Sequence, residues 1–218
     1  MHMIIRSAGL AALALTLLVG CAGHEPVQES VQPRANVVPA QGPGLPVDDP
    51  HSPIPAPGTC KLGSRDGQPL PDPKCTPGAI NPAVHQDNIA STICKSGWTK
   101  TVRPPTSLTN RIKLQIDRAY GLPTNTQGEL DHHVSLELGG APDDPRNLWV
   151  EPGKIPNPKD AVENKLNGAV CAGLIPLTTA QTALAHSWVT AFDDAGLRVA
   201  GGKVCLRDDP TRCVGRGK

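Results

Sequence analysis

The sequence predicts an α+β fold in which a small strand–turn–strand–helix unit is embedded in a mainly helical domain stapled by disulfide bonds. Residues 128–138 carry leucine and valine at strand positions, Gly139-Gly140 is a turn signal, and residues 146–149 begin a second short strand. An Asn-Pro pair at residues 157–158 then marks the N-cap and first position of a helix. The third observation is the even number of cysteines that remain once Cys21 is set aside.

The composition limits the size of the core. The 218 residues leave room for one domain of ordinary size, but they include 24 prolines and 22 glycines and only one Phe and one Tyr. A single large core is therefore not expected. The formal net charge of +1 excludes a grossly basic protein, although basic residues can still cluster locally.

Residues 1–21 read as a targeting segment. Arg6 precedes an apolar run from Ala8 to Val19 that is too short to span a bilayer comfortably. The end of this run, Val19-Gly20-Cys21, resembles a bacterial lipoprotein signal, in which the cysteine is lipidated and becomes the mature N-terminus. An ordinary signal peptide cleaved nearby is the alternative. The first interpretation predicts an exported protein that is lipid-anchored to the bacterial cell envelope through Cys21.

Three further segments follow. Residues 22–58 are rich in Pro and Gly and show no period, so we expect a disordered tether between the membrane and the domain. Residues 59–195 form the predicted domain. Residues 196–218 are Gly-rich and basic, and they are expected to form a disulfide-closed appendage.

The cysteines other than Cys21 indicate disulfides, because an even number in an exported chain is typical of a disulfide framework. A zinc site is the alternative, but no C-x-x-C pair accompanies them. Fifteen pairings are possible. We favour two local closures and one bridge that staples two helices, namely Cys60–Cys75, Cys205–Cys213 and Cys94–Cys171.

Helical periodicity predicts four helices. They are expected at 81–95, at 108–120 with Gly121 as the stop, from 158 with its apolar face against the two strands, and from 178 or 179 to 192. Residues 95–118 form the most basic stretch of the chain. Such a stretch is either a solvated face or a track for a phosphate backbone.

The central motif resembles the HNH family of ββα-metal endonucleases. The resemblance is carried by Asp131-His132, Gly139-Gly140 and Asn147-Leu148 in this order, followed by a capped helix. It implies a ββα-metal motif, hydrolysis of DNA phosphodiester bonds and a divalent cation. The chain departs from the family at Ser135, where proline is common, and in having no histidine at the third motif position.

The resemblance assigns roles residue by residue. His132 matches the general base, Asp131 a metal-ligating carboxylate, Asn147 the asparagine that orients the loop and the base, and Asn157 the third position, as a second metal ligand. Oxygen ligands of this kind suit Mg²⁺ or Mn²⁺ better than Zn²⁺. Phosphate contacts are expected from six basic side chains, each of which can equally be a surface charge: Lys100, Arg103, Arg111, Lys113, Arg146 and Lys159.

Two alternatives stay open within the motif. Neighbouring residues of a strand point in opposite directions, so only one of His132 and His133 can face the site, and the order after Asp131 favours His132. Asn157 can be an N-cap without any metal, and Glu151 is then the alternative oxygen ligand.

The sequence thus predicts an exported, membrane-tethered endonuclease that acts on nucleic acid, DNA being the expected substrate, and that works as a monomer. The alternative is a non-catalytic lipoprotein that uses the same fold to bind nucleic acid or another envelope component. A third interpretation is a purely structural envelope domain.

Overall fold

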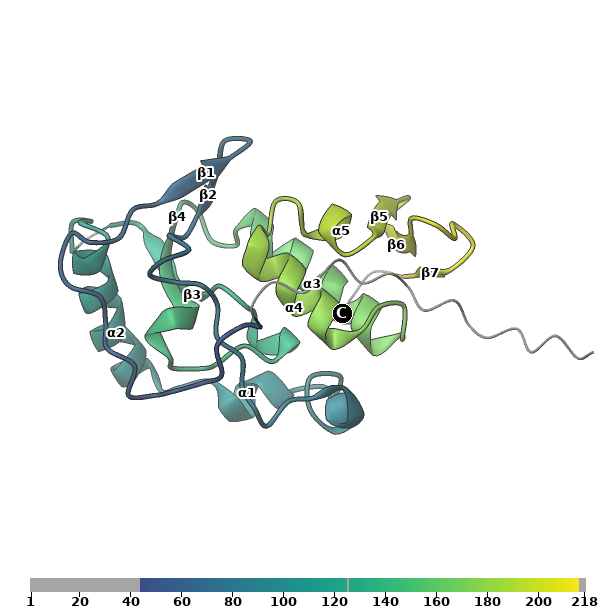
Figure 1. Ribbon diagram of the computed structural model, residues 1–218, viewed down its shortest axis with the longest axis horizontal. Helices are drawn as coiled ribbons and strands as arrows, with labels where there is room; N and C mark the ends of the chain where they lie inside the picture. Colours follow the sequence, from purple (N-terminus) through teal and green to yellow (C-terminus); the bar gives the residue numbers. More distant parts are fainter. Residues whose placement is uncertain (1–43, 125, 216–218) are drawn as a thin grey trace, which may run out of the picture. The chain divides into compact units, whose positions relative to one another are not determined.

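The computed structural model describes residues 44–124 and 126–215, and the predicted lipoprotein signal with Cys21 lies outside them. The described residues combine helices and short strands, which confirms the α+β class (Figure 1). In chain order the elements are β1 (Gly63–Arg65), β2 (Gln68–Leu70), η1 (Gln86–Ser91), α1 (Trp98–Val102), α2 (Thr106–Ala119), β3 (Gly128–His132), η2 (Leu136–Leu138), η3 (Pro145–Asn147), β4 (Leu148–Pro152), α3 (Pro158–Cys171), α4 (Leu177–His186), α5 (Ala191–Asp194), β5 (Leu197–Ala200), β6 (Lys203–Leu206) and β7 (Cys213–Val214).

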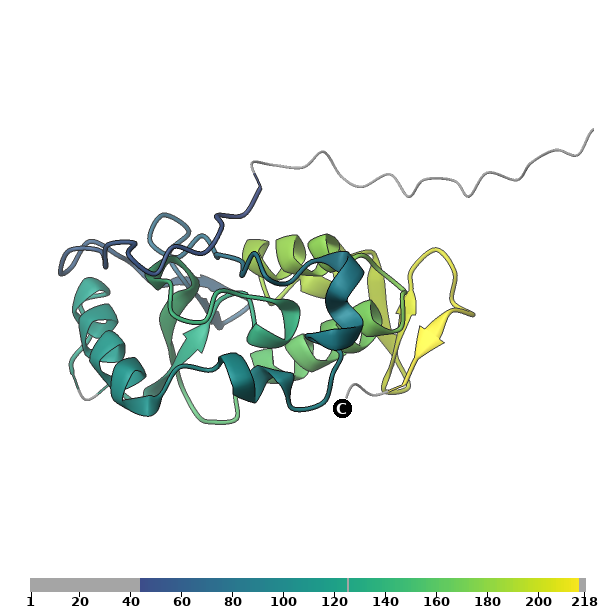
Figure 2. The same ribbon diagram turned by 90° about the horizontal axis from the view of Figure 1, so that it is seen from below.

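The strands form three small antiparallel sheets, β1–β2, β3–β4 and β5–β6–β7. The β3–β4 hairpin lies between α2 on one side and the α3–α4 pair on the other, as both ribbon views show (Figures 1 and 2). The predicted order of strand, loop, strand and helix is therefore present as β3, η2–η3, β4 and α3.

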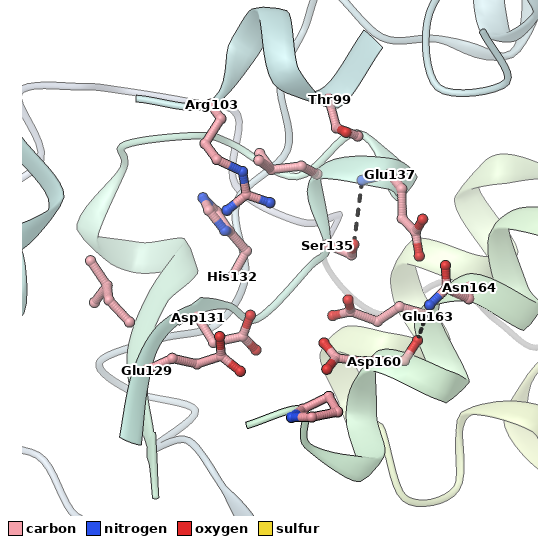
Figure 3. A pocket seen from close by; sticks show the side chains of 13 residues that line it. Thr99, Arg103, Glu129, Asp131, His132, Ser135, Glu137, Asp160, Glu163 and Asn164 are labelled. Carbon is pink, nitrogen blue, oxygen red and sulfur yellow. Dashed lines mark hydrogen bonds between the residues drawn. The ribbon is translucent and has the colours of Figure 1, made fainter. Parts of the chain in front are cut away.

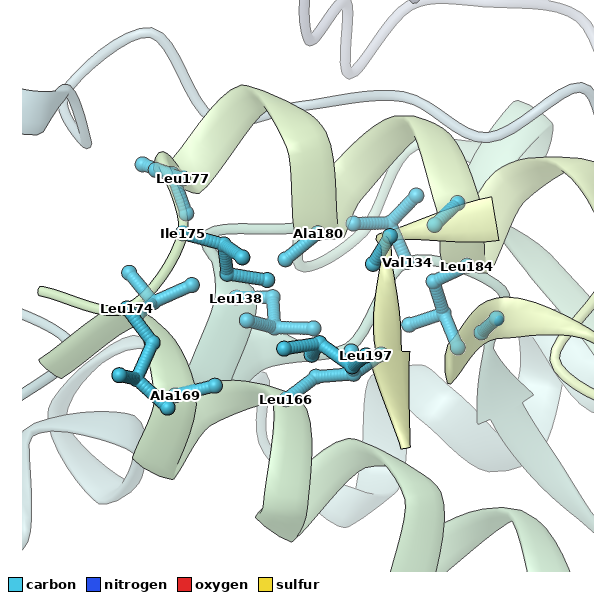
Figure 4. Close-up of a cluster of buried hydrophobic side chains, with 14 of the residues drawn as sticks. Val134, Leu138, Leu166, Ala169, Leu174, Ile175, Leu177, Ala180, Leu184 and Leu197 are labelled. Atoms are coloured by element: carbon cyan, nitrogen blue, oxygen red, sulfur yellow. The ribbon is translucent and has the colours of Figure 1, made fainter. Parts of the chain in front are cut away.

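Two apolar clusters hold these elements. One lies between α2 and β4 and contains Ile112, Ile116, Tyr120 and the buried Trp149. The larger cluster joins η2, α3, α4 and β5 (Figure 4); its buried members include Val134, Leu138, Leu166, Leu184 and Leu197. The apolar face of α3 was expected to pack on the two strands, but it packs on η2 and α4. The helix that covers β4 is α2.

Three predicted boundaries are wrong. The helix expected at 81–95 is reduced to the 3-10 helix η1, because the Asn88 side chain bonds to the backbone of His85 and Ala83 and competes with an α-helical pattern. The tether was expected to run to residue 58, yet Val47 pairs with Ile80. The tail from 196 is not a separate appendage, because Leu197 belongs to the larger core cluster.

All three predicted disulfides are present. Cys60–Cys75, Cys94–Cys171 and Cys205–Cys213 have Cα–Cα distances of 5.9, 5.6 and 4.0 Å. Cys94–Cys171 ties the last residue of α3 to the segment after η1 rather than joining two α-helices. Among the described residues, no helix has the length and apolar character that crossing a membrane requires.

Candidate active site

The β3–β4 hairpin places the acid–histidine pair at the end of a strand. Asp131 pairs with Trp149 and His132 with Leu148, so the pair stands beside the first residues of β4. The strand was expected to continue to Leu138, but it ends at His132. The reason is local: His133 N still donates to Asn147 O, but beyond it Val134 N bonds to the Asn147 side chain at Oδ1 and Glu137 N to the Ser135 side chain at Oγ.

Asn147 clamps the loop that follows His132. Its Oδ1 accepts from Val134 N at 2.8 Å, and its Nδ2 donates to Val134 O at 3.0 Å and to Ala141 O at 2.9 Å. The side chain is completely buried. Gly140 makes this approach possible, since a Cβ there would stand 1.8 Å from Val134 O and 2.8 Å from Asn147 Nδ2. The carbonyl that holds His132 comes from Pro142, next to this clamped segment.

His132 is presented as a neutral base. Its Nε2 lies 2.9 Å from Pro142 O, and because a carbonyl oxygen only accepts, Nε2 must carry the proton. Nδ1 then keeps a lone pair, and none of the described residues donates a hydrogen bond to it. Burial, together with the positive charges of Arg103 and Lys159, lowers the pKa of His132 below its ordinary value despite the nearby Asp131 carboxylate.

His133 points the other way. Its Nε2 donates to Ala185 O at 2.9 Å, at the end of α4, while its Nδ1 is buried without a partner among the described residues. Burial lowers the pKa of His133 to about 4, so the ring is neutral at physiological pH. His132 lines the cavity described next and His133 does not, which is the arrangement that the strand alternation predicts.

The first cavity opens in front of His132 and has a volume of about 430 Å³. Figure 3 shows Arg103 beside His132, with Asp131 and Glu129 reaching in from β3 and the α3 side chains opposite. Five carboxylates line this cavity, against Arg103 as its single cationic lining residue: Glu129, Asp131, Glu137, Asp160 and Glu163. Burial raises the pKa of Glu137 to about 7, and the neighbouring Asp160 carboxylate adds to this shift while Lys159 opposes it.

Lys159 was predicted to contact phosphate, and that prediction is wrong for this structure. The side chain is 1% exposed, and its ammonium donates to Asp131 Oδ2 at 2.7 Å, to His132 O at 2.8 Å and to Glu163 Oε1. Burial disfavours the charged form, but the two carboxylates outweigh burial and raise the pKa of Lys159 above its ordinary value. Lys159 is thus an internal cation that ties α3 to the end of β3.

Glu151 lies behind Asp131 rather than in the cavity. It is 3% exposed, and burial and the neighbouring Asp131 carboxylate raise the pKa of Glu151 to about 9. It therefore carries a proton at neutral pH and can share it with Asp131. Because it lies outside the cavity lining, Glu151 is not placed as an oxygen ligand for a metal ion there.

Asn157 also differs from its predicted role as a metal ligand. Its Oδ1 accepts from Asp160 N at 3.2 Å, which makes it the N-cap of α3, and its Nδ2 donates to Glu129 Oε1 at 2.6 Å. Asn157 does not line the cavity. The side chain serves the helix start, so the predicted Asp131–Asn157 ligand pair does not form.

A second set of oxygen donors does face the cavity. Lys159 holds one oxygen of Asp131 and one of Glu163 at this cavity, and Asn164 follows Glu163 on the α3 side (Figure 3). Asn164 Nδ2 donates to Asp160 O at 2.7 Å, and no residue within 44–124 or 126–215 donates a hydrogen bond to its Oδ1. Within residues 44–124 and 126–215, no three His, Cys, Asp or Glu side chains are already arranged to hold a metal ion. The donor chemistry nevertheless fits Mg²⁺ or Mn²⁺, since carboxylate and amide oxygens are their usual ligands.

The predicted phosphate contacts divide into two groups. Arg103 lines the cavity, and its guanidinium makes no hydrogen bond or ion pair within the described part of the chain. Lys113 lines a second cavity while bound to Asp117. Lys100 and Arg111 line neither cavity, and the Arg146 guanidinium is held by Asp144 at 2.6 Å. Only Arg103 and Lys113 are therefore brought to the site.

Sequence reasoning missed the acidic lining contributed by Glu129, Glu137 and Glu163, and it missed Asn164. One signal was available for α3. Residues 160, 163 and 164 have the i, i+3, i+4 spacing of one helical face.

No protein-family model matches the chain, and neither a curated protein nor a solved structure matches it.

Proposed function

We propose that this chain is a metal-dependent endonuclease of the HNH type that hydrolyses phosphodiester bonds of DNA with His132 as general base. The observation that carries the proposal is the state of His132. Its Nε2 donates to the Pro142 carbonyl, its Nδ1 retains a lone pair, and it lines a polar cavity beside Arg103, whose guanidinium has no partner among the described residues. A neutral imidazole held in this way is suited to take a proton from water.

The reaction assigns one task to each side chain. His132 Nδ1 accepts a proton from a water molecule, whose oxygen attacks phosphorus while the bond from phosphorus to the leaving oxygen breaks. The leaving oxygen takes a proton from solvent, and the imidazolium returns its own proton to solvent. Asp131 lies next to His132, and its negative charge favours the imidazolium that forms. Arg103 is placed to bind the non-bridging oxygens of the phosphate.

A divalent cation would help to bring a phosphodiester to this cavity, because the ionised members of its five acidic side chains otherwise repel the phosphate. Asp131, Glu163 and Asn164 would hold that cation. When bound, Mg²⁺ or Mn²⁺ would neutralise charge on the phosphate and on the leaving oxygen. Lys159 supports the arrangement, since its ammonium fixes one oxygen of Asp131 and one oxygen of Glu163.

Three disulfides are consistent with the proposed export to the cell envelope, because such bonds persist in oxidising compartments. Anchoring through Cys21 remains a prediction of the sequence.

Incubation of the purified protein with plasmid DNA, with Mg²⁺ or with EDTA, tests the proposal. Wild-type protein should nick or cut the plasmid only with the metal. His132→Ala should lower the rate by about 10²–10⁴-fold, the usual contribution of a general base. Plasmid binding without cleavage in every condition would instead favour the non-catalytic binding module.

A further inference from the structure

A second cavity adjoins the first and shares its key residues. It has a volume of about 330 Å³, and both cavities are lined by Arg103, Glu129, Leu130 and His132. The proposed phosphate position, at Arg103 and His132, is therefore the junction of two spaces. The first cavity is lined by the carboxylates, and the second takes no part in the proposed hydrolysis.

The chemistry of the second cavity differs from that of the first. Of the five carboxylates only Glu129 reaches it, and it adds the cation of Lys113. Its walls include the apolar groups of Pro104, Leu130 and Leu148. Such a space favours a neutral, partly apolar group attached to an anion, whereas the first cavity favours cations.

One face of α2 supplies the polar contacts. Thr106, Thr109, Asn110 and Lys113 line the cavity at i, i+3, i+4 and i+7, the spacing of a single helical face. The Asn110 amide makes no hydrogen bond within the described residues, so its donor and its acceptor are both available. An asparagine amide can bond to a base edge through both groups at once, most favourably to adenine.

We propose that the second cavity binds the nucleoside next to the scissile phosphate, and that this nucleotide is unpaired, so that single-stranded nucleic acid is the preferred substrate. The inference rests on the proposed nuclease function. A volume near the lower end of small-molecule sites suits one nucleoside. Pro104, Leu130 and Leu148 would contact the sugar and the faces of the base, and Asn110 its edge.

The preference for single strands follows from geometry. A base that is paired and stacked in a duplex cannot enter a cavity walled by a helix and a strand. Entry requires extrusion of the nucleotide, and extrusion costs least when the base is already unpaired. Arg103 and Lys113 would hold the backbone on either side of the base.

The test compares one sequence as a single strand and as a hairpin duplex, in DNA and in RNA, with the full chain and its variants. Affinity is measured by fluorescence anisotropy in EDTA and cleavage in Mg²⁺. Asn110→Trp fills the cavity, and Gln115→Trp is the matched control, because Gln115 is an exposed residue of the same helix that lines neither cavity. We expect tighter binding and faster cleavage of the single strand. Asn110→Trp should weaken single-strand binding about tenfold or more, the scale of one lost base contact, and Gln115→Trp should not.

Equal affinity for the single strand and the duplex, or equal behaviour of the two tryptophan variants, would overturn the inference. The affinity measurements in EDTA test the preference for single strands even if no cleavage occurs. Failure of the nuclease proposal has a different signature, because cleavage would then be absent from the wild type or unchanged in His132→Ala. Comparison of the DNA strand with the RNA strand shows which of the two nucleic acids this cavity prefers.

Discussion

Removal of the Asn147 amide should destabilise the protein severely. Asn147→Ala leaves three buried backbone groups without their partners: Val134 N, Val134 O and Ala141 O. Each unsatisfied group costs about 1–3 kcal/mol, and partial relaxation of the loop keeps the total near the low end, at about 3–5 kcal/mol. That is a large part of the stability of about 5–15 kcal/mol expected for a domain.

Urea unfolding followed by tryptophan fluorescence measures this loss, because Trp149 and Trp188 are buried. With a slope of about 2 kcal/mol/M, the midpoint should fall by about 1.5–2.5 M. Asn147→Asp should be no milder, since it places an oxygen opposite two carbonyl oxygens. Asn110→Ala is the matched control and should change stability by less than about 0.5 kcal/mol. A loss below about 1 kcal/mol for Asn147→Ala would refute the clamp.

Three further predictions concern stability. Lys159→Met should cost about 3–5 kcal/mol, because it leaves the Asp131 and Glu163 carboxylates without their cation. Thermal unfolding should show no such loss for Lys165→Met, since the half-buried Lys165 makes no ion pair with any described residue. The pKa of Glu137 is raised by burial from 4.5 to about 7, so the folded state binds its proton more tightly than the unfolded state. The stabilisation by protonated Glu137 is present below pH 4.5 and is lost as the pH rises through about 7. Urea titrations over this range should show a smaller loss of stability with pH in Glu137→Gln than in the wild type. An equal loss in the two proteins would contradict the raised pKa of Glu137. Replacing Cys94 and Cys171, which are 77 residues apart, with alanine should lower the free energy of unfolding by about 2–5 kcal/mol, and a change under about 1 kcal/mol would show that the bridge does not staple the core.

The parts of the fold that the sequence predicts well are those set by short-range chemistry. The turn glycines and the asparagine before β4 lie within 20 residues of His132, so the loop between them could be anticipated. The faces of α2 and α3 followed from helical spacing. The disulfide pairs followed from proximity in the chain for two of the three.

The parts that failed depend on contacts between distant residues. A lysine in the first turn of a helix is usually exposed, and nothing near Lys159 shows that Asp131, 28 residues earlier, meets it. From the sequence, Asn157 could be either a metal ligand or the N-cap of a helix. The structure shows the N-cap, because Asn157 Oδ1 accepts from Asp160 N and its Nδ2 donates to Glu129. The burial of Leu197 in the main core likewise depends on tertiary packing.

The pH dependence of the cleavage rate tests the central claim, that neutral His132 activates water. The value of kcat/KM for a single-stranded DNA substrate should rise with pH through an apparent pKa below the ordinary histidine value of 6.5, because burial and Arg103 lower the pKa of His132. This rise should disappear in His132→Ala and persist in His133→Gln, whose amide can still donate to Ala185 O. A profile that survives in His132→Ala but is lost in His133→Gln would contradict the account and assign the base to the other histidine.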